Sequence, residues 1–184
     1  CKDIAKLHKS TKIVIVCSGA IALGSKSISK SVLRKLQDKQ AAASIGQIEL
    51  AYQWRTKLKK FKINVSQILL TLEDSETRRR YLNAKNTISS LQNKNIIPII
   101  NENDTVATEE IKYGDNDKLA ARVAQMIEAD LLILMSDVDG LYEDNPKKNL
   151  NVKKISEVIK IDKRIELIAK SQTSELGSGG MTTK

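Results

Sequence analysis

A group of carboxylates and carboxamides lies in the middle of the chain. The run 100–104 reads Ile-Asn-Glu-Asn-Asp, and a second polar run, Gly-Asp-Asn-Asp, occupies 114–117. The Asp104 carboxylate can accept hydrogen bonds from an ammonium group, and the Asn116 side chain can both donate and accept. A turn followed by a helix cap would explain one or two of these residues but not so many together. The grouping predicts binding of an amine-bearing substrate, and Asp115 to Asp117 also predict the start of a helix.

A serine and a glycine follow an earlier apolar run, at Ser18 and Gly19. Glycine lets the backbone turn sharply and lets an oxygen-rich ligand approach main-chain N–H groups, while the Ser18 hydroxyl can donate to a carboxylate or phosphate. A tight turn after a strand explains the same two residues equally well. This signal is therefore weak on its own.

Two further segments have residue types suited to nucleotide binding. The segment 136–142, Ser-Asp-Val-Asp-Gly-Leu-Tyr, can present main-chain groups and short side chains to a nucleotide. A calcium loop is disfavoured there because the acidic residue that closes a twelve-residue calcium loop is missing. The segment 177–184, Gly-Ser-Gly-Gly-Met-Thr-Thr-Lys, offers clustered N–H donors to phosphate and a mobile positive charge at Lys184. Its spacing is not that of a Walker loop, and a flexible tail is the alternative.

The elements that must position these residues follow from hydrophobic periodicity. Short apolar runs at 12–17, 63–70, 96–101 and 129–136 are typical of strands buried on both faces. Between these runs, apolar residues recur at the spacing of a helix. The three predicted stripes are Leu50, Trp54, Leu58 and Phe61; Tyr81, Ala84, Ile88 and Leu91; and Leu119, Val123, Met126 and Ile127. Alternating strands and helices predict an α/β fold, a three-layer αβα sandwich around a mostly parallel sheet. Ligands of such sheets collect at the carboxyl ends of the strands, where the polar runs described above lie.

Several local features refine this prediction. Pro98 inside the third run predicts an irregular strand there, since proline lacks the N–H that a ladder needs. Residues 105–113 are expected to form a small hairpin, and 26–39 a loop or helix start. The opening residues, Lys2 to Ser10, read as the end of a helix that leads into a strand.

Composition and charge exclude some classes of protein. The chain has 184 residues, two cysteines and one histidine, so neither a disulfide framework nor a His/Cys metal cluster is expected. No apolar run is long enough to span a bilayer, and a reduced, cytoplasmic chain is predicted. The net charge of +9 raises the question of nucleic acid. However, 102–117 holds six acidic residues against one lysine, and aromatic residues are only 3% of the chain. A lysine-rich solvated surface is the favoured interpretation.

Taken in order, these segments resemble the amino acid kinase family. The run INENDTVATEEIKYGDNDKLAA, residues 100–121, is the most specific element, because related acetylglutamate, aspartate, carbamate and uridylate kinases differ there. VIVCSGAIALG, RRYLNAKNT, LMSDVDGLYEDNP and GSGGMTTK support the resemblance in the expected order. It implies transfer of the ATP γ-phosphoryl group to the side-chain carboxylate of glutamate, the first step of proline synthesis. Magnesium is implied as well, held mostly by ATP phosphates and water, with no protein ligand assigned.

The resemblance also implies roles for individual residues. Ser18, Asp104 and Asn116 match glutamate-binding positions of the family. Lys184 matches a lysine that stabilises the charge on the transferring phosphoryl group, and Asp117 an aspartate that orients catalytic lysines. The matches to ATP-binding positions are Ser136, Asp137, Ser178, Gly179, Gly180, Met181, Thr182, Thr183 and Lys184.

The resemblance extends over residues 1–184 as one kinase domain, expected to be incomplete at both ends: the family's N-terminal strand and glycine loop with a second catalytic lysine do not precede Cys1, and more of the domain is expected after Lys184. A homo-oligomer is implied, with 41–54 as a candidate surface, although the apolar face there, Trp54 in particular, can equally be core. No membrane partner is expected. Two alternatives remain: a related kinase using another carboxylate or a phosphate as acceptor, and a non-catalytic basic binding module.

Overall fold

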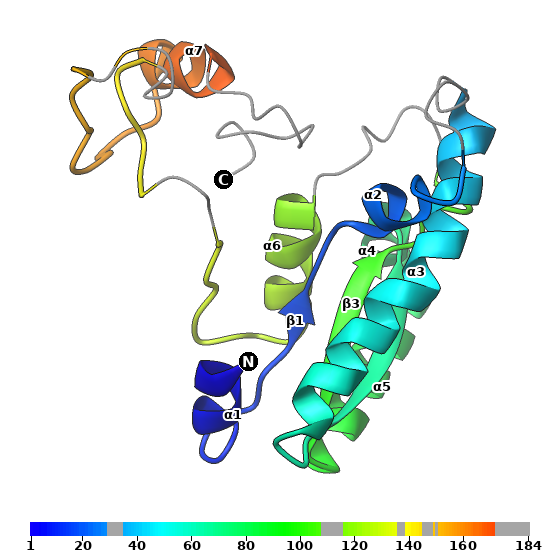
Figure 1. The fold of residues 1–184 in the computed structure, drawn as a ribbon. Helices are drawn as coiled ribbons and strands as arrows, with labels where there is room; N and C mark the ends of the chain where they lie inside the picture. The colour runs from blue at the N-terminus through cyan, green and yellow to red at the C-terminus, as the bar shows by residue number, and fades with distance from the viewer. Residues whose placement is uncertain (29–34, 108–115, 136–138, 145–148, 150, 172–184) are drawn as a thin grey trace.

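A computed structural model describes residues 1–28, 35–107, 116–135, 139–144, 149 and 151–171. Its sheet has three strands, β1 (Ile15–Val16), β2 (Asn64–Leu70) and β3 (Ile96–Glu102). The strand order is β1-β3-β2, and β3 pairs with both neighbours in parallel. Figure 1 shows this sheet between helices that lie on both of its faces. The predicted α/β class and parallel sheet are confirmed, as are three of the four predicted strands.

The central strand β3 runs without interruption through Pro98, which corrects the expected irregularity. Pro98 pairs with Ser66 in a continuous register with β2. The carbonyl of Ile100 accepts from the N–H of Cys17, so Ile100 turns its backbone polar groups toward β1. Residues two apart in a strand face the same way, so Pro98 also faces β1. Since β1 begins only opposite Ile99, no ladder bond is required where the proline lacks its N–H.

One face of the sheet is covered by α5 (Arg78–Asn93) and α6 (Asn116–Met126). Both helices have apolar residues at three- and four-residue spacing, which places those residues on one stripe. The core on this face is formed by fully or nearly fully buried side chains: Leu70, Ile88, Ile100, Leu119, Val123 and Met126. Both helices were predicted from this spacing, and the structure confirms them.

The opposite face is covered by α3 (Leu36–Lys59), with α1 (Lys2–Leu7) beside it. Leu58 of α3 is completely buried against Ile97 and Ile99. Ile97 and Ile99 point to this face while Ile100 points to the other, as the alternation of side chains along a strand requires. Helices, sheet and helices therefore make the three predicted layers. Phe61, expected on the helical stripe, lies beyond the end of α3 and is exposed.

A close contact between two helices holds the end of β1 in place. The short helix α2 (Ala20–Gly24) packs against the middle of α3. A β-carbon on Gly46 would overlap the carbonyl oxygen of Ala20, and one on Gly24 would overlap that of Ala42. The two backbones thus approach as closely as glycine allows. This contact positions the turn between β1 and α2.

The prediction of a fourth strand over 129–136 is wrong for those residues of the run that the structure describes. Residues 131–135 form no strand, and Leu131, Ile133 and Met135 are 74%, 66% and 83% exposed. The segment leaves the end of α6 and runs away from the sheet (Figure 1), so no neighbouring strand supplies its hydrogen bonds. An apolar run becomes a buried strand only where a ladder and a covering layer receive it.

The remaining described elements are α4 (Leu72–Glu76), which follows β2, and α7 (Lys163–Ser171), which lies apart from the sheet in Figure 1. The helix predicted at the start of the chain is present as α1. Most of the hairpin expected over 105–113 lies outside the described residues, as do residues 29–34. Of the loop or helix start expected over 26–39, residues 36–39 form the beginning of α3. None of the described helices is both long and apolar enough to cross a bilayer.

Candidate functional site

The carboxyl ends of the three strands meet at one edge of the sheet. The N–H of Cys17 donates to the carbonyl of Ile100, and the N–H of Asn103 donates to that of Leu70, at 2.9 and 2.8 Å. These bonds carry the alignment of the strands past their last residues. The polar segments that follow β1, β2 and β3 therefore begin side by side, as the parallel fold predicted.

Asp104 lies at this edge and is 92% buried, with 8% of its surface exposed. It lines a cavity of about 190 Å³ together with Glu102, Asn103 and Thr105 from the end of β3 and Gln47 from α3; the other lining residues are Ala43, Ser44, Ile48, Gln67 and Leu69. Burial raises the pKa of Asp104 to about 6, an effect partly opposed by a backbone hydrogen bond. The carboxylate is therefore poorly solvated and suited to an incoming cation, whose charge would replace the lost hydration.

A second buried polar residue, Asn101, was part of the polar run but received no role from the sequence. Its Nδ2 donates to Oε1 of Gln47 over 2.7 Å, while its Oδ1 has no hydrogen-bond partner among the described residues. The N–H₂ of Gln40 donates to the carbonyl of Ala107 at 3.1 Å. Two glutamines of α3 thus tie the end of β3 to that helix. The sequence held one sign of this contact. Gln47 lies four residues after Ala43, so its polar side chain is on the same side of α3 as the small buried residues.

Ser18 lies two residues after the end of β1 and is exposed at the same edge. Gly19 has φ +110°, a left-handed conformation in which other residues are strained, and it precedes the first residue of α2. No atom lies within 4 Å of the position that a β-carbon would take there. The predicted turn with an accessible serine is present, but Ser18 is not among the residues that line the cavity around Asp104.

Asn116 and Asp117 form the first turn of α6, as predicted from the sequence. The first turn of α6 lies at the end of the sheet where β3 ends (Figure 1). Asp117 adds negative charge at a helix N-terminus, where it is favourable. The Oδ1 of Asn116 is buried without a hydrogen-bond partner among the described residues. The structure thus brings these two residues to the same edge as Asp104, outside the lining of its cavity.

The strand β2 ends at this edge in a capped helix. The N–H of Thr71 donates to Oδ2 of Asp74 at 2.7 Å, and the N–H of Asp74 donates to the Thr71 hydroxyl oxygen at 3.3 Å. This reciprocal capping box satisfies the first donors of α4. The polar residues after β2 are thus explained locally by this helix cap.

The predicted nucleotide-binding residues Ser136, Asp137 and 178–184, including Lys184, lie outside the described residues. The neighbouring Asp139 is described. It accepts hydrogen bonds from Lys154 Nζ at 2.8 Å and the Tyr142 hydroxyl at 2.7 Å, which lower the pKa of its carboxyl to about 2. Asp139, Tyr142 and Lys154 therefore hold a short two-stranded contact together.

The described residues contain no group of three or more His, Cys, Asp or Glu side chains placed to hold a metal ion. Asp104 and Glu102 supply two carboxylates at the sheet edge. A divalent ion there would need further oxygen ligands from substrate or water.

A parallel sheet covered by helices on both faces, with polar side chains gathered beyond the carboxyl ends of its strands, defines an α/β ligand-binding domain. Over residues 1–184 the sequence matches the model of the amino acid kinase family, and the chain belongs to that family.

Curated relatives include proteins named glutamate 5-kinase. The protein of Pelagibacter ubique (strain HTCC1062) is 59% identical over 186 residues, which cover 100% of this chain and 50% of that protein. The Paramagnetospirillum magneticum protein is 51% identical, covering 99% and 50%, and the Bradyrhizobium diazoefficiens protein is 54% identical, covering 99% and 49%. The chain thus spans about half the length of the curated relatives it matches.

Proposed function

We propose that the protein transfers the γ-phosphoryl group of ATP to the side-chain carboxylate of glutamate, giving glutamyl 5-phosphate, the first step of proline biosynthesis. The relatives named glutamate 5-kinase, at 51 to 59% identity over the whole chain, support this choice of acceptor. The observation that carries the proposal is the buried carboxylate of Asp104 in a cavity at the carboxyl edge of the sheet.

In this proposal Asp104 receives the α-ammonium group of glutamate. A buried carboxylate whose pKa is raised to about 6 is stabilised when a cation docks against it, so binding favours its ionised form. The Ser18 hydroxyl donates a hydrogen bond to a substrate carboxylate, and Asn116 contributes its amide donors and its buried Oδ1, which has no partner among the described residues. All three residues lie at the carboxyl edge of the sheet, although only Asp104 among them lines the cavity there.

The transfer step needs alignment more than proton transfer. A carboxylate is already deprotonated at neutral pH and attacks phosphorus without a general base. The enzyme must bring two anions together and neutralise the charge that develops between them. We assign Lys184 to the transferring phosphoryl group, Asp117 to the orientation of catalytic lysines, and Ser136, Asp137 and 178–184 to ATP. Magnesium would be held mainly by ATP phosphates and water.

The test compares Asp104→Asn with Asp3→Asn, which removes a carboxylate from α1 at the other end of the sheet. Full-length protein is assayed for ATP turnover with glutamate, aspartate or acetylglutamate, magnesium, and hydroxylamine to trap an acyl phosphate. Hydroxamate from glutamate alone is expected. Asp104→Asn should raise the KM for glutamate by about 10- to 100-fold, the loss of a charge-assisted contact, with a much smaller change in the KM for ATP.

Hydroxamate from another acceptor would instead indicate a related kinase of the family. A change in the KM for ATP alone would remove Asp104 from the glutamate site. No turnover by folded full-length protein would contradict the proposed reaction. The Asp3→Asn variant should retain the kinetic constants of the unmodified protein.

Self-association and a cytoplasmic location also remain proposals. On α3, Trp54 packs against the core, which is the second of the two interpretations stated for its apolar side chain. Ile45, Ile48 and Tyr52 of the same helix are exposed. Light scattering of the protein and of an Ile48→Glu variant would measure whether this side of α3 joins copies of the chain.

A further inference from the structure

A second cavity lies at the opposite end of the sheet, where the strands begin. It measures about 370 Å³ and is bounded by 8–13, the turn that leads from α1 toward β1, and by 92–96, the turn that leads from α5 into β3. Parallel strands have their amino ends together, so this cavity is separated from the site around Asp104 by the length of the sheet. Among the described residues, none of those to which a role in the reaction is assigned lines it.

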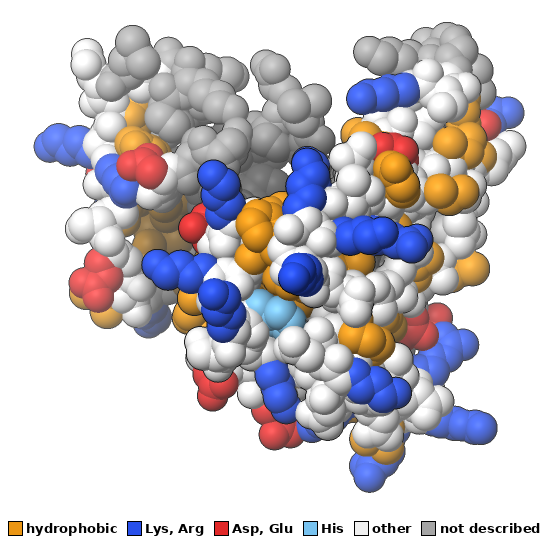
Figure 2. Space-filling view, turned by 60° about the horizontal axis from the view of Figure 1, so that its bottom comes forward, with side chains coloured by type: hydrophobic (Ala, Val, Ile, Leu, Met, Phe, Trp, Pro, Cys, Tyr) orange, Lys and Arg blue, Asp and Glu red, His pale blue; other side chains and the backbone are white. Residues whose placement is uncertain are grey.

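The described residues that line this cavity are rich in hydrogen-bond donors and include no carboxylate. Lys9 and Lys12 carry positive charge, and hydroxyl, amide and imidazole groups come from Ser10, Thr11, Gln92, Asn93, Asn95 and His8; the remaining lining residues are Ile13 and Ile96. Figure 2 shows the histidine at the centre of this face with basic side chains around it. The lining therefore matches the charge and hydrogen-bonding needs of an oxyanion.

Side-chain contacts across the cavity hold its two walls together. Lys12 Nζ donates to Oδ1 of Asn93 over 2.9 Å, and His8 Nε2 lies 3.4 Å from the carbonyl oxygen of Asn95. Asn95 has φ +57°, the left-handed conformation that ends the turn after α5. The walls are thus connected without a ligand, and Lys12 keeps further ammonium protons for one.

His8 adds a polar atom that the protein itself does not use. Its Nδ1 is buried and has no hydrogen-bond partner in the described part of the chain. With Nε2 donating to Asn95, a protonated ring would offer Nδ1–H as a further donor. A buried polar atom without a partner is unfavourable unless a ligand or water completes it.

Lysines near helix ends have a simpler explanation, because positive charge is favourable beside the carbonyl groups at a helix C-terminus. Here a carbonyl in the last turn of each helix already accepts a backbone hydrogen bond, that of Leu7 from Ser10 at 3.1 Å and that of Gln92 from Asn95 at 3.0 Å. The ammonium groups are thus not needed to satisfy those carbonyls. The helix ends therefore do not explain why a cavity lies between the two turns.

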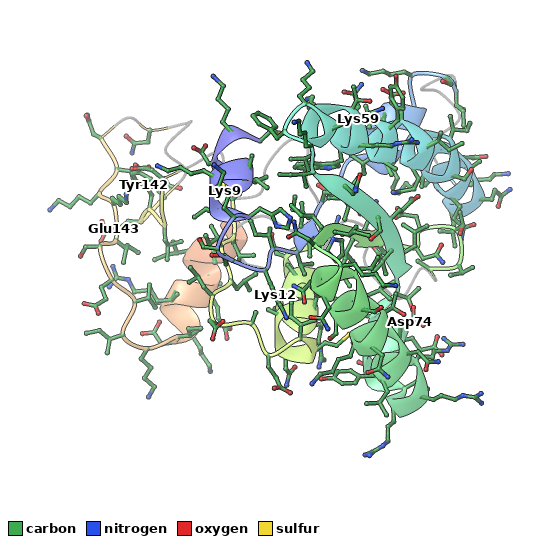
Figure 3. The ribbon with its side chains drawn as sticks, turned by 90° about the horizontal axis from the view of Figure 1, so that it is seen from below. Lys9, Lys12, Lys59, Asp74, Tyr142 and Glu143 are labelled. Atoms are coloured by element: carbon green, nitrogen blue, oxygen red, sulfur yellow. The ribbon has the colours of Figure 1, made fainter. Side chains whose placement is uncertain are left out.

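We propose that this cavity binds a small molecule through a phosphate or carboxylate group, with Lys9 and Lys12 as its cationic contacts and His8 beside them. Figure 3, which views the molecule from this side, shows Lys9 and Lys12 on adjoining parts of the chain, while Lys59 lies apart on α3. Lys59 is exposed and does not line the cavity, so it serves as a matched control.

His8 is the only histidine of the chain, so the proton on its Cε1 gives a single histidine reporter signal in proton NMR. Inorganic phosphate and citrate are titrated separately into the chain at constant pH and ionic strength, with chloride as the reference anion. At least one of the two should shift the His8 signal along a saturable curve. Lys12→Gln should weaken that binding at least tenfold and Lys9→Gln several-fold, whereas Lys59→Gln should leave it unchanged.

Phosphate alone or citrate alone would identify the group recognised. A shift that does not saturate, that chloride reproduces, or that Lys59→Gln weakens as much as Lys12→Gln would overturn the proposal, because it would indicate general attraction to a basic face. An amide correlation spectrum of each variant checks its fold. Should Lys12→Gln fail to fold, Lys9→Gln carries the comparison. The experiment needs neither ATP nor turnover, so its outcome is independent of the kinase assignment.

Discussion

The strand β3 and the segment 131–135 are similar in sequence and opposite in environment. Both contain a run of mostly aliphatic residues, which polar residues follow. Ile97 and Ile100 of β3 are completely buried, whereas Leu131 and Met135 are mostly exposed. β3 has a parallel neighbour on each side and a helical layer on each face. Within the part of the chain that the structure describes, 131–135 has no such neighbours and no such layers. Composition determines which residues can be buried, and neighbouring elements decide which are.

The residues that follow the two runs differ in the same way. Asp104, after β3, is buried, and its pKa is raised to about 6. Asp139, after 131–135, is exposed, and hydrogen bonds from Lys154 and Tyr142 lower its pKa to about 2. Two aspartates in similar sequence positions thus titrate in opposite directions, because one loses hydration and the other gains donors.

The largest contrast is expected from truncating one isoleucine in each run. Ile100→Ala should lower the free energy of unfolding by about 2–5 kcal/mol, because it removes buried methyl groups and leaves a cavity between the sheet and α6. Ile133→Ala should change it by less than about 0.5 kcal/mol, since that side chain is already in water. Urea unfolding measures both. Comparable losses would show that 131–135 is buried in solution and would remove the contrast.

A second contrast concerns two glycines. Gly46→Ala should destabilise the protein by about 1–3 kcal/mol, because the new methyl group meets the backbone carbonyl of Ala20 where α2 and α3 touch. Alanine favours the helix itself by up to about 1 kcal/mol, so a net loss isolates the steric effect. Gly140→Ala meets only the flexible end of Lys154.

Thermal unfolding of both glycine variants gives the comparison, with Gly140→Ala expected near the parent protein. A stabilised Gly46→Ala would mean that α2 and α3 are farther apart than the structure shows. The turn holding Ser18 would then be less firmly positioned.

The smallest expected effect is the pH dependence of the two aspartates. Asp104 has a folded-state pKa above its ordinary 3.8, so its ionisation reduces stability as the pH rises from about 4 through 6. Asp104→Asn should therefore stabilise the protein at pH 7, with the gain disappearing below pH 4. Asp139 is the reverse case: its contribution is present above pH 4 and is lost as the pH falls toward 2.

Asp139→Asn should thus be slightly destabilising at pH 7, with solvent screening keeping the effect small. Unfolding midpoints measured from pH 3 to 8 compare the two variants. A gain from Asp104→Asn that does not depend on pH would show that packing, rather than the charge, causes it.

The place of the predicted site residues in the fold could be foreseen in part from the sequence. Asp104 was predicted from its type and its place after an apolar run, and Asn116 from its type and its place at a helix N-terminus; their roles stay predictions. Gln47 was missed, because its partner Asn101 is distant in the chain and only packing of α3 on the sheet brings them within 2.7 Å. The His8 and Lys12 cavity was missed for the same reason, since its two walls come from separate turns.

By itself the sequence determined the layers and the polarity of the site: periodicity alternates between strand and helix, and polar residues collect where parallel strands end. Tertiary structure alone decided the rest. It placed Pro98 where β1 has not yet begun, brought Gly24 and Gly46 into contact with opposing backbones, and left 131–135 exposed. The physical reason is that periodicity is a local property, whereas hydrogen-bond partners, close contacts and burial depend on what lies across the fold.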